Sequence, residues 1–313
     1  MKFATIKDRE KRKERNNKKT KDKGERIMAK LYALYNPTSG GGAGFPTSGK
    51  LETFFENDEI EYVDVTSLNS YQSFFAALQA DERVVLCGGD GTINYFANAF
   101  RGCELDRELY YYPTGTGNDF WYDIGKDASS APILLNDYLK NLPSVTIDGK
   151  ESLFINGVGY GIDGYCCEEG DKERAKSDKP VNYAAIAVKG LLFDFKPRGA
   201  VVTVDGKEYT YKKVWIAATM HGRCYGGGMI AAPDQVRNNA DGTVSVFVWH
   251  SSGKLPTLMA FPSIFKGEHV KKTNMITIIT GKEINVKFNA PTPCQIDGET
   301  VTGVSEYSVK AGR

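Results

Sequence analysis

Residues 84–96 read VVLCGGDGTINYF, and this stretch decides the fold of the first half of the chain. Residues 84–87 are an apolar run typical of a buried strand, whereas the residues from Thr92 onward have the apolar spacing of a helix. The glycines between them predict a tight turn. A strand, a glycine turn and a helix together form one unit of an α/β sheet with parallel strands.

The same turn is chemically suited to phosphate. Gly88, Gly89 and Gly91 permit positive φ and a close backbone approach to an anion. The helix that follows presents unpaired N–H groups and a positive dipole end. Asp90 alone would repel phosphate, so we interpret it as a direct or water-mediated partner of Mg²⁺. The alternative interpretation is a strand–helix turn with a capping aspartate.

The neighbouring segments repeat this unit. Strands are predicted at 29–35, 60–66, 83–89 and 108–113, and helices at 50–57, 70–80 and 92–100. Such alternation predicts a doubly wound parallel sheet that binds ligands at the carboxyl ends of its strands. We assign residues 28–147 to this nucleotide-binding α/β domain.

From about residue 145 the pattern changes to strands joined by Asp-Gly or Gly-Lys turns. Two apolar, helix-like segments, 179–195 and 253–267, interrupt these strands. We expect an antiparallel β-sandwich at 148–300 that meets the first domain at a cleft. Residues 301–313 are expected to return to the first domain.

Composition places the chain among globular proteins. It has 313 residues, of which 41% are hydrophobic and 25% charged. No apolar run approaches the roughly 18 residues that span a bilayer. Six cysteines without CxxC pairs or disulfide-framework spacing indicate a reducing compartment, and three histidines show no zinc-ligand spacing. The start of the sequence lacks the apolar region of a secretory signal, so we predict a cytoplasmic location.

The start of the chain is strongly basic. Residues 1–30 carry a net charge of +8, whereas the whole chain carries +1. Such a tail can bind anionic lipid or nucleic acid. We favour a solvated, disordered leader at residues 1–27 and expect no nucleic-acid partner. Met28 is a second possible start, because a strand begins immediately after it.

Two other glycine motifs are weaker. GFPTSGKL (44–51) nearly matches a P-loop, but Leu51 stands where a Ser or Thr hydroxyl would hold Mg²⁺. GYGIDG (159–164) matches G-x-G-x-x-G but lies in the β-rich half without a clear βαβ unit. Neither motif favours a different fold, and no G-x-S-x-G elbow of a serine hydrolase is present.

Six motifs taken in order are more specific. They are NPTSGGG (36–42), GGDGT (88–92), PTGTGNDF (113–120), NGVGYGID (156–163), ADGTVSV (240–246) and QIDGE (295–299). With them the chain resembles the diacylglycerol kinase catalytic family, particularly its soluble bacterial lipid kinases, over about residues 29–300. GGDGT also resembles loops of NAD kinases and phosphofructokinases, whereas PTGTGNDF with a downstream DGE is more specific to lipid kinases.

The resemblance implies a two-domain fold with ATP in the interdomain cleft. The residues that it implies for the nucleotide are Asn36, Pro37, Thr38, Ser39, Gly40, Thr66, Gly88, Gly89, Asp90, Gly91, Thr92, Asn94, Thr116 and Asn118. Asp119 and Asp163 resemble members of an acidic, Mg²⁺-linked network with Asp90. A structural Mg²⁺ is implied at Asn238, Asp241 and Thr243, although an Asp-Gly turn needs no metal.

Asp297 and Glu299 in QIDGE resemble the catalytic pair of the family, with either one as proton acceptor. Neighbouring carboxylates around a metal can have one pKa raised, which gives a base that works near neutral pH. Phosphoryl transfer depends mostly on positioning and charge neutralisation. A hairpin turn is the alternative interpretation of DGE by itself.

We therefore predict an ATP- and Mg²⁺-dependent lipid kinase that phosphorylates a hydroxyl of diacylglycerol or a related lipid. The alternatives are an NAD kinase-like enzyme and a catalytically silent lipid- or nucleotide-binding protein. Tyr95 supports the silent alternative, because family members usually have glutamate at this place.

The apolar segments 180–195 and 255–265 predict a lipid-facing surface, with core helices as the alternative. Their basic neighbours suit a transient, peripheral contact with an anionic membrane. These neighbours are Lys189, Lys196, Arg198, Lys266, Lys271 and Lys272. The sequence does not determine the oligomeric state, and a homodimer is one option.

Overall fold

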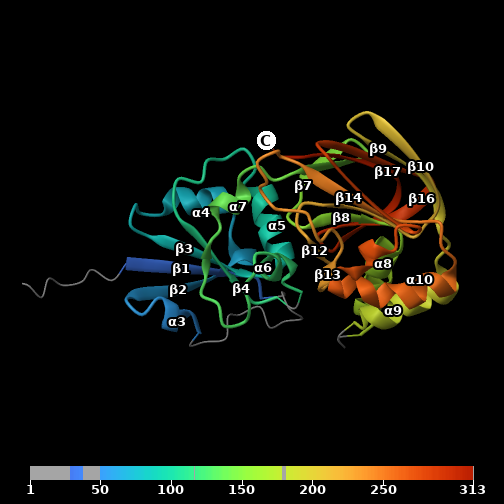
Figure 1. Cartoon of the computed structure of the whole chain (residues 1–313). Helices are drawn as coiled ribbons and strands as arrows, with labels where there is room; N and C mark the ends of the chain where they lie inside the picture. Colours follow the sequence, from blue (N-terminus) through green and yellow to red (C-terminus); the bar gives the residue numbers. More distant parts are fainter. Residues whose placement is uncertain (1–28, 38–49, 116, 178–180, 313) are drawn as a thin grey trace, which may run out of the picture.

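A computed structural model describes residues 29–37, 50–115, 117–177 and 181–312, which form two domains side by side (Figure 1). The first domain contains a mainly parallel sheet and the second an antiparallel β-sandwich, so the predicted fold class is confirmed. None of the helices in these residues is long and apolar enough to cross a bilayer. All six cysteines are free.

The first sheet has the strand order β2-β1-β3-β4-β5. Its strands are β1 (Ala29–Tyr35), β2 (Asp58–Asp64), β3 (Arg83–Gly88), β4 (Leu109–Pro113) and β5 (Ile133–Leu134). The helices of this domain are α3 (Lys50–Phe54), η1 (Val65–Ser67), α4 (Tyr71–Ala77), α5 (Asp90–Ala99), α6 (Asp119–Asp123) and α7 (Asn136–Leu139). Strands β1 to β4 are parallel and only β5 is antiparallel, so the carboxyl ends of four strands share one edge.

Strand β3 is apolar from residue 84 to residue 87 because helices cover both faces of the sheet. Val84 and Leu86 pack into a core that includes Phe96 of α5. Val85 and Cys87 point to the opposite core. All four side chains are fully buried. A strand buried on both faces cannot alternate apolar and polar residues, which explains the continuous run from residue 84 to 87.

The second sheet has the order β15-β14-β11-β8-β16-β17-β6-β7, and β9 and β10 branch from β16. Its strands are β6 (Ser144–Ile147), β7 (Lys150–Leu153), β8 (Gly157–Tyr160), β9 (Arg198–Val204), β10 (Lys207–Val214), β11 (Ile216–Met220), β14 (Val244–Trp249), β15 (Ile276–Gly281), β16 (Glu283–Ile296) and β17 (Glu299–Lys310). A separate hairpin consists of β12 (Cys224–Tyr225) and β13 (Met229–Ile230).

The branch at β16 produces the two layers. Residues 284–288 pair with β9, whereas residues 294–296 pair with β8. The apolar core between the layers therefore includes Val202 from one side, Val246 from the other and Tyr307 of β17. Three hairpins turn through Asp-Gly, at residues 148–149, 205–206 and 297–298, and both residues of each pair have positive φ. This is the conformation that such turns require.

The predicted boundary at 147/148 falls inside the β6–β7 hairpin, and β6 already pairs with β17 of the second sheet. The predicted return of residues 301–313 to the first domain is limited to the last described residues. Residues 301–310 belong to β17 of the second sheet, because the hairpin with β16 continues to Lys310. Beyond it, Gly312 packs against the backbone of Asn141.

Helices gather at the lower right of Figure 1. They are α8 (Ile162–Arg174), α9 (Tyr183–Lys189), η2 (Gly190–Asp194), α10 (Lys254–Ala260), η3 (Phe261–Lys266) and η4 (Glu268–Lys271). The sequence did not predict α8, because its two glycines and many charges hide any apolar stripe. Those glycines serve close packing instead: Gly164 lies against the backbone of Pro293 and Gly170 against the ring of Tyr183.

The same packing explains GYGIDG. A Cβ at Gly159 would overlap the carboxylate of Asp163, and one at Gly161 would overlap the backbone oxygen of Trp215. These glycines are therefore used by protein contacts, which argues against a dinucleotide site here. Most of the other weak motif, GFPTSGKL, lies outside the described residues.

Candidate functional site

The described residues that were predicted to bind a nucleotide lie along the carboxyl edge of the first sheet. Asn36 and Pro37 follow β1, Thr66 follows β2, residues 89–92 follow β3, and Asn118 follows β4. Because these strands are parallel, their carboxyl ends meet at one edge. The predicted residues Thr38, Ser39, Gly40 and Thr116 lie outside the described residues.

Two glycine loops touch at this edge. A Cβ at Gly115 would lie 2.5 Å from the Cα of Gly89, so the backbones meet without side chains between them. Gly89 caps α5 without a side-chain hydrogen bond, which leaves the first N–H groups of that helix without an intrahelical acceptor. Buried oxygens of Thr114 (Oγ1) and Asn118 (Oδ1) have no partner among the described residues. These groups can serve a bound anion or hydroxyl.

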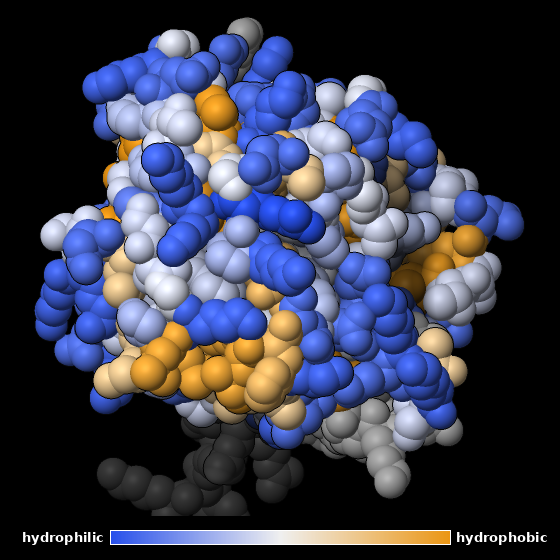
Figure 2. All heavy atoms as spheres, turned by 90° about the vertical axis from the view of Figure 1, so that its right-hand side faces the viewer, coloured by the Kyte–Doolittle hydropathy of each residue, from blue (hydrophilic) through white to orange (hydrophobic). Residues whose placement is uncertain are grey.

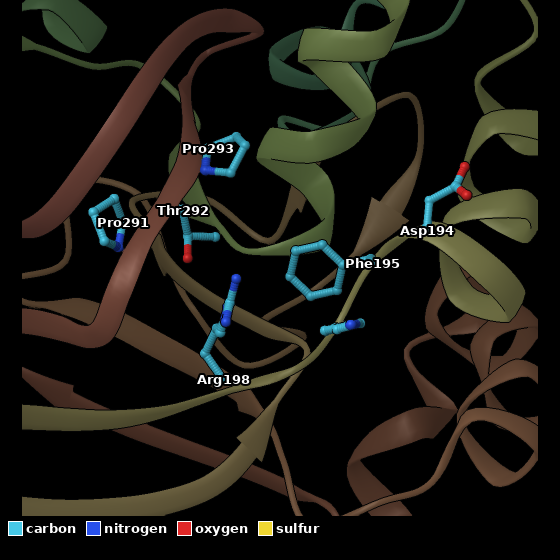
Figure 3. A pocket seen from close by; sticks show the side chains of 7 residues that line it. Asp194, Phe195, Arg198, Pro291, Thr292 and Pro293 are labelled. Atoms are coloured by element: carbon cyan, nitrogen blue, oxygen red, sulfur yellow. The ribbon is translucent and has the colours of Figure 1, made fainter.

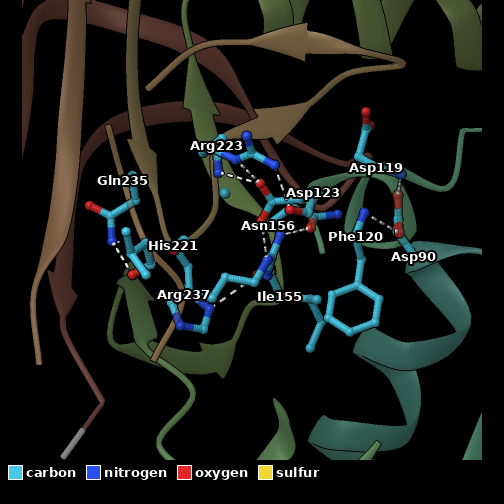
Figure 4. A network of polar contacts seen from close by, with 12 residues as sticks. Asp90, Asp119, Phe120, Asp123, Ile155, Asn156, His221, Arg223, Gln235 and Arg237 are labelled. Carbon is cyan, nitrogen blue, oxygen red and sulfur yellow. Dashed lines mark hydrogen bonds and ion pairs between the residues drawn. The ribbon is translucent and has the colours of Figure 1, made fainter. Parts of the chain in front are cut away.

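Asp90 connects the two glycine loops. Its carboxylate accepts hydrogen bonds from the backbone N–H groups of Asp119, at 2.7 Å, and Phe120, at 3.1 Å (Figure 4). It therefore caps α6, which starts the segment after the second loop. Burial and the nearby Asp119 carboxylate raise the pKa of Asp90 to about 7. Each carboxylate oxygen still has a lone pair for a cation.

Asp119 connects the first domain to the second. Its carboxylate accepts hydrogen bonds from the N–H groups of Gly227 (2.8 Å) and Gly228 (2.6 Å), in the turn between β12 and β13. Both glycines have positive φ, which turns the two N–H groups toward one acceptor. Burial raises the pKa of Asp119, and the two N–H groups oppose that shift.

Asp297 is held by four donors. Its carboxylate accepts from three consecutive backbone N–H groups, of residues 155–157, at 2.5–3.0 Å, and from Nδ2 of Asn94 at 2.8 Å. Burial raises the pKa of this carboxyl, and the hydrogen bonds counteract the shift. Asp297 thus ties the β16–β17 turn to α5 and to the segment that enters β8. Its surroundings are those of a structural carboxylate.

Glu299 differs from Asp297 in its exposure to solvent and in its hydrogen bonding. It is exposed, and its carboxylate makes no hydrogen bond or ion pair with any described residue. One of its oxygens lies 4.0 Å from the position that a Cβ at Gly91 would occupy. The carboxylate therefore reaches over the glycine loop at the start of α5 and is available to a ligand there.

The three acids of the predicted metal network are not in one cluster. Asp163 is buried in the second domain, where it accepts from the Tyr225 hydroxyl at 3.1 Å and from the N–H of Gly164 at 3.0 Å. Burial raises its pKa to about 6. In the described part of the chain, no group of three or more His, Cys, Asp or Glu side chains has metal-binding geometry.

In the loop predicted to hold a structural Mg²⁺, the side-chain amide of Asn239 makes hydrogen bonds across the loop. Asn239 Nδ2 donates to the carbonyl oxygens of Val236 and Thr243, and its Oδ1 accepts from the N–H and hydroxyl of Thr243. Asn238 donates to the carbonyl of Asp137 at 3.1 Å, and Asp241 is exposed. The metal site at Asn238, Asp241 and Thr243 stays a prediction.

Tyr95 lies beside the site without entering its hydrogen bonds. Its side chain is 66% exposed, and its ring centroid is 6.1 Å from that of Tyr71. The preceding Asn94 points to Asp297 and Leu153. The usual glutamate of the family is therefore replaced at an exposed position of α5. The hydroxyl of Thr66, a predicted nucleotide-binding residue, donates to the carboxylate of the nearby Asp64 at 2.7 Å.

A polar network that was not predicted from the sequence joins the two domains (Figure 4). Asp123 of α6 pairs with Arg237 through Nε and with Arg223 at 3.0 Å. The guanidinium of Arg237 also donates to the carbonyl of Ile155 and to Oδ1 of Asn156. One signal was available: Asp123 follows Asp119 by four residues, so both lie on one face of a helix.

His221 borders this network and supports a pH prediction. The buried ring contacts the carbonyl oxygen of Ile155 through Nδ1 at 3.1 Å. Burial and then Arg237 lower its pKa from 6.5 to about 4. In the unfolded chain the imidazole binds a proton below about pH 6.5, whereas in the folded chain it binds one only below about pH 4. His221 should therefore reduce the free energy of unfolding by roughly 3 kcal/mol between pH 7 and pH 4.

The measurement compares urea midpoints of the wild type and His221→Gln from pH 7 to pH 4. Asp90 and Asp163, whose pKa values are raised, act in the opposite direction, so the difference between the two proteins is the informative quantity. We expect the variant to have the flatter acid limb. Partial burial also lowers the pKa of His250, so His250→Gln should flatten the acid limb too, but less than His221→Gln does. Equal slopes for wild type and His221→Gln would refute the prediction.

A parallel α/β domain with glycine loops at the carboxyl edge of its sheet, followed by a β-sandwich, defines the class of NAD kinase-like and diacylglycerol kinase-like folds. Residues 30–142 match the family model described as diacylglycerol kinase catalytic domain. Residues 156–309 match the YegS C-terminal NAD kinase beta sandwich-like domain. The chain belongs to the diacylglycerol kinase catalytic-domain family, as its motifs predicted.

Individual relatives are distant. A diacylglycerol kinase of Mycobacterium tuberculosis is 24% identical over 80% of this chain and 82% of its own length. A diacylglycerol kinase of Bacillus subtilis is 25% identical over 87% of this chain and 90% of its own length. The crystal structure of a diacylglycerol kinase from Bacillus anthracis has a TM-score of 0.54 at 18% identity, covering 91% of this chain and 94% of that one. That similarity establishes the fold.

Proposed function

We propose that this protein is a lipid kinase that transfers the γ-phosphate of ATP to the hydroxyl of diacylglycerol or a related lipid, with Mg²⁺. The observation that carries the proposal is the position of Glu299. Its free carboxylate reaches over the glycine loop at the start of α5. A proton acceptor beside an anion-binding loop is the arrangement that phosphoryl transfer to an alcohol needs.

The proposed nucleotide site uses backbone groups first. The N–H groups at the start of α5 would bind phosphate oxygens, assisted by the positive end of the helix dipole. Thr114 Oγ1 and Asn118 Oδ1, both buried without a partner among the described residues, would bind polar groups of the nucleotide. The contact between Gly89 and Gly115 keeps this surface free of side chains.

Asp90 and Asp119 are the residues that fit a catalytic metal best. Both carry a carboxylate near the glycine loops, and each oxygen is held by only one N–H group. Mg²⁺, when bound, would neutralise phosphate charge in the transition state. Asp163, engaged by Tyr225 in the second domain, fits this role less well.

In the proposed reaction the lipid hydroxyl oxygen bonds to the γ-phosphorus while the bond from that phosphorus to ADP breaks. The hydroxyl proton passes to Glu299. Asp297 acts differently, because its oxygens are occupied by residues 155–157 and Asn94. It positions the turn from which Glu299 extends, so the two predicted acids divide the roles of base and positioning residue.

The experiment is transfer of labelled phosphate from ATP with Mg²⁺. We expect the full chain to label a component of a total lipid extract, and then diacylglycerol or another purified hydroxyl lipid. NAD is assayed in parallel as the acceptor of an NAD kinase. Labelling of NAD alone would refute the proposal, and ATP binding without transfer to any lipid would favour the silent binding protein.

A further inference from the structure

Six large apolar side chains are exposed on the helices of the second domain. They are Tyr183, Val188, Phe193, Leu255, Met259 and Phe265, and they are between 41 and 76% exposed. We call this set the apolar patch. Figure 2 shows a hydrophobic area with hydrophilic residues around it in the lower part of this face, the level of α9 and α10 in Figure 1.

The helices that carry the patch have two apolar faces. Leu191 of η2 and Ile264 of η3 are buried in the core of the second domain. Lys254 at the start of α10 donates to the carbonyl of Leu192 at 2.6 Å and holds α10 against η2. Core packing therefore explains the inner face of these helices, and it leaves the outer face, with Phe193 and Met259, unexplained.

A pocket opens where η2 leaves the patch. Residues 194–196, Arg198 and residues 291–293 line this space of about 160 Å³, which we call the basic pocket (Figure 3). Arg198 points into it between Thr292 and Phe195. The side chains of Lys196 and Arg198 are exposed and have no ion-pair partner among the described residues.

The acid in the pocket is already neutralised. Asp194 pairs with Lys189 at 3.2 Å and accepts from the Tyr165 hydroxyl at 3.0 Å. In Figure 3 its carboxylate points away from Arg198. The pocket therefore offers two uncompensated cations, Lys196 and Arg198, to an anion that enters it, and Phe193 of the apolar patch is only three residues from Lys196.

We propose that the basic pocket binds the phosphate of an anionic phospholipid headgroup while the apolar patch inserts into the upper acyl layer. The positive charge of the pocket favours an anionic bilayer over a second copy of the chain as the occupant. A symmetric pairing of two apolar patches would bring two cationic pockets close together, and they would repel each other. Adjacent exposed apolar and basic side chains are the features by which proteins dock on anionic bilayers. The docking explains how a kinase reaches a lipid, and its biological purpose rests on the proposed function.

The test is co-sedimentation of the full chain with phosphatidylcholine vesicles, with and without phosphatidylglycerol. Lys196→Gln with Arg198→Gln should weaken binding to the anionic vesicles about 10- to 30-fold, near the effect of two cations at a charged surface. Binding to neutral vesicles should not change. Phe193→Ser with Met259→Ser should weaken binding to both kinds. All four side chains are exposed, so the fold should survive.

The charge-matched control is Lys282→Gln with Lys310→Gln, two exposed lysines outside the pocket. An equal loss in the control would overturn the pocket assignment. Inorganic phosphate is titrated in a separate experiment without vesicles. If it saturates the pocket at a lower concentration than phosphatidylglycerol does, free phosphate and not a lipid headgroup is the ligand of the pocket. A shift from dimer to monomer in the patch variant, with vesicle binding intact, would make a second copy the occupant.

The vesicle assay contains no ATP, so its result is independent of turnover. A chain that binds anionic vesicles through the pocket but phosphorylates no lipid keeps the docking surface and refutes the proposed function. A chain that phosphorylates dispersed lipid but does not bind anionic vesicles keeps the proposed function and refutes the docking surface.

Discussion

Replacement of Glu299 by glutamine is expected to lower the turnover number by about 10²- to 10⁴-fold, the usual contribution of a general base. Glutamine has nearly the same shape but cannot accept the hydroxyl proton. Since Glu299 is exposed and has no partner among the described residues, the variant should fold normally. The measurement is kcat for the lipid acceptor, together with the urea midpoint.

Glu306→Gln is the matched control. Glu306 is an exposed carboxylate on the same strand, and its partner is Lys287 at 3.4 Å. An exposed ion pair of this kind contributes little, so the control should keep both turnover and stability. Near-normal turnover in Glu299→Gln would show that Glu299 is not the base.

Replacement of Asp297 by alanine should instead reduce the free energy of unfolding by on the order of 4 kcal/mol. The change removes the acceptor of three backbone N–H groups at residues 155–157, and each buried donor left unpaired costs about 1–3 kcal/mol. Asn94 also loses its bond to the turn. Urea unfolding followed by circular dichroism measures the loss.

Two further variants separate the causes. Asp148 has the same turn conformation, with φ near 49°, but its exposed side chain makes no hydrogen bond or ion pair with a described residue. Asp148→Ala therefore isolates the cost of alanine at positive φ, roughly 1 kcal/mol. Asp297→Asn keeps one acceptor and the turn preference, so its loss should be intermediate. If Asp297→Ala costs no more than Asp148→Ala, the carboxylate does not hold the turn.

The two predictions together distinguish chemistry from positioning. Glu299→Gln should change turnover without stability, whereas Asp297→Ala should change stability first. These two acids are only two residues apart, yet they lie in different surroundings, because Asp297 is in the positive-φ Asp-Gly turn and Glu299 is the first residue of the following strand. The turn residue faces the buried segment 155–157, and the first residue of β17 faces the glycine loop.

Much of the architecture could be read from local signals. The apolar run of β3 indicated a strand buried on both faces, and Asp-Gly pairs indicated the three tight hairpins. The helix α8 escaped prediction because Gly164 and Gly170 are used for close packing against distant residues. The apolar segment around 180–195 has a buried side with Leu191 in the core and an exposed side with Phe193, and its contact with lipid stays a prediction.

The sequence by itself determined the order of strands and turns, the glycine loops and the family, since each depends on neighbouring residues. Only the tertiary structure decided what each acid does. Four aspartates stand in similar glycine-rich motifs, and the sequence does not distinguish their roles. Each nevertheless accepts hydrogen bonds from a different segment of the folded chain; the four are Asp90, Asp119, Asp163 and Asp297. The protonation and role of a carboxylate depend on burial and on donors brought from elsewhere in the chain, and these exist only after folding.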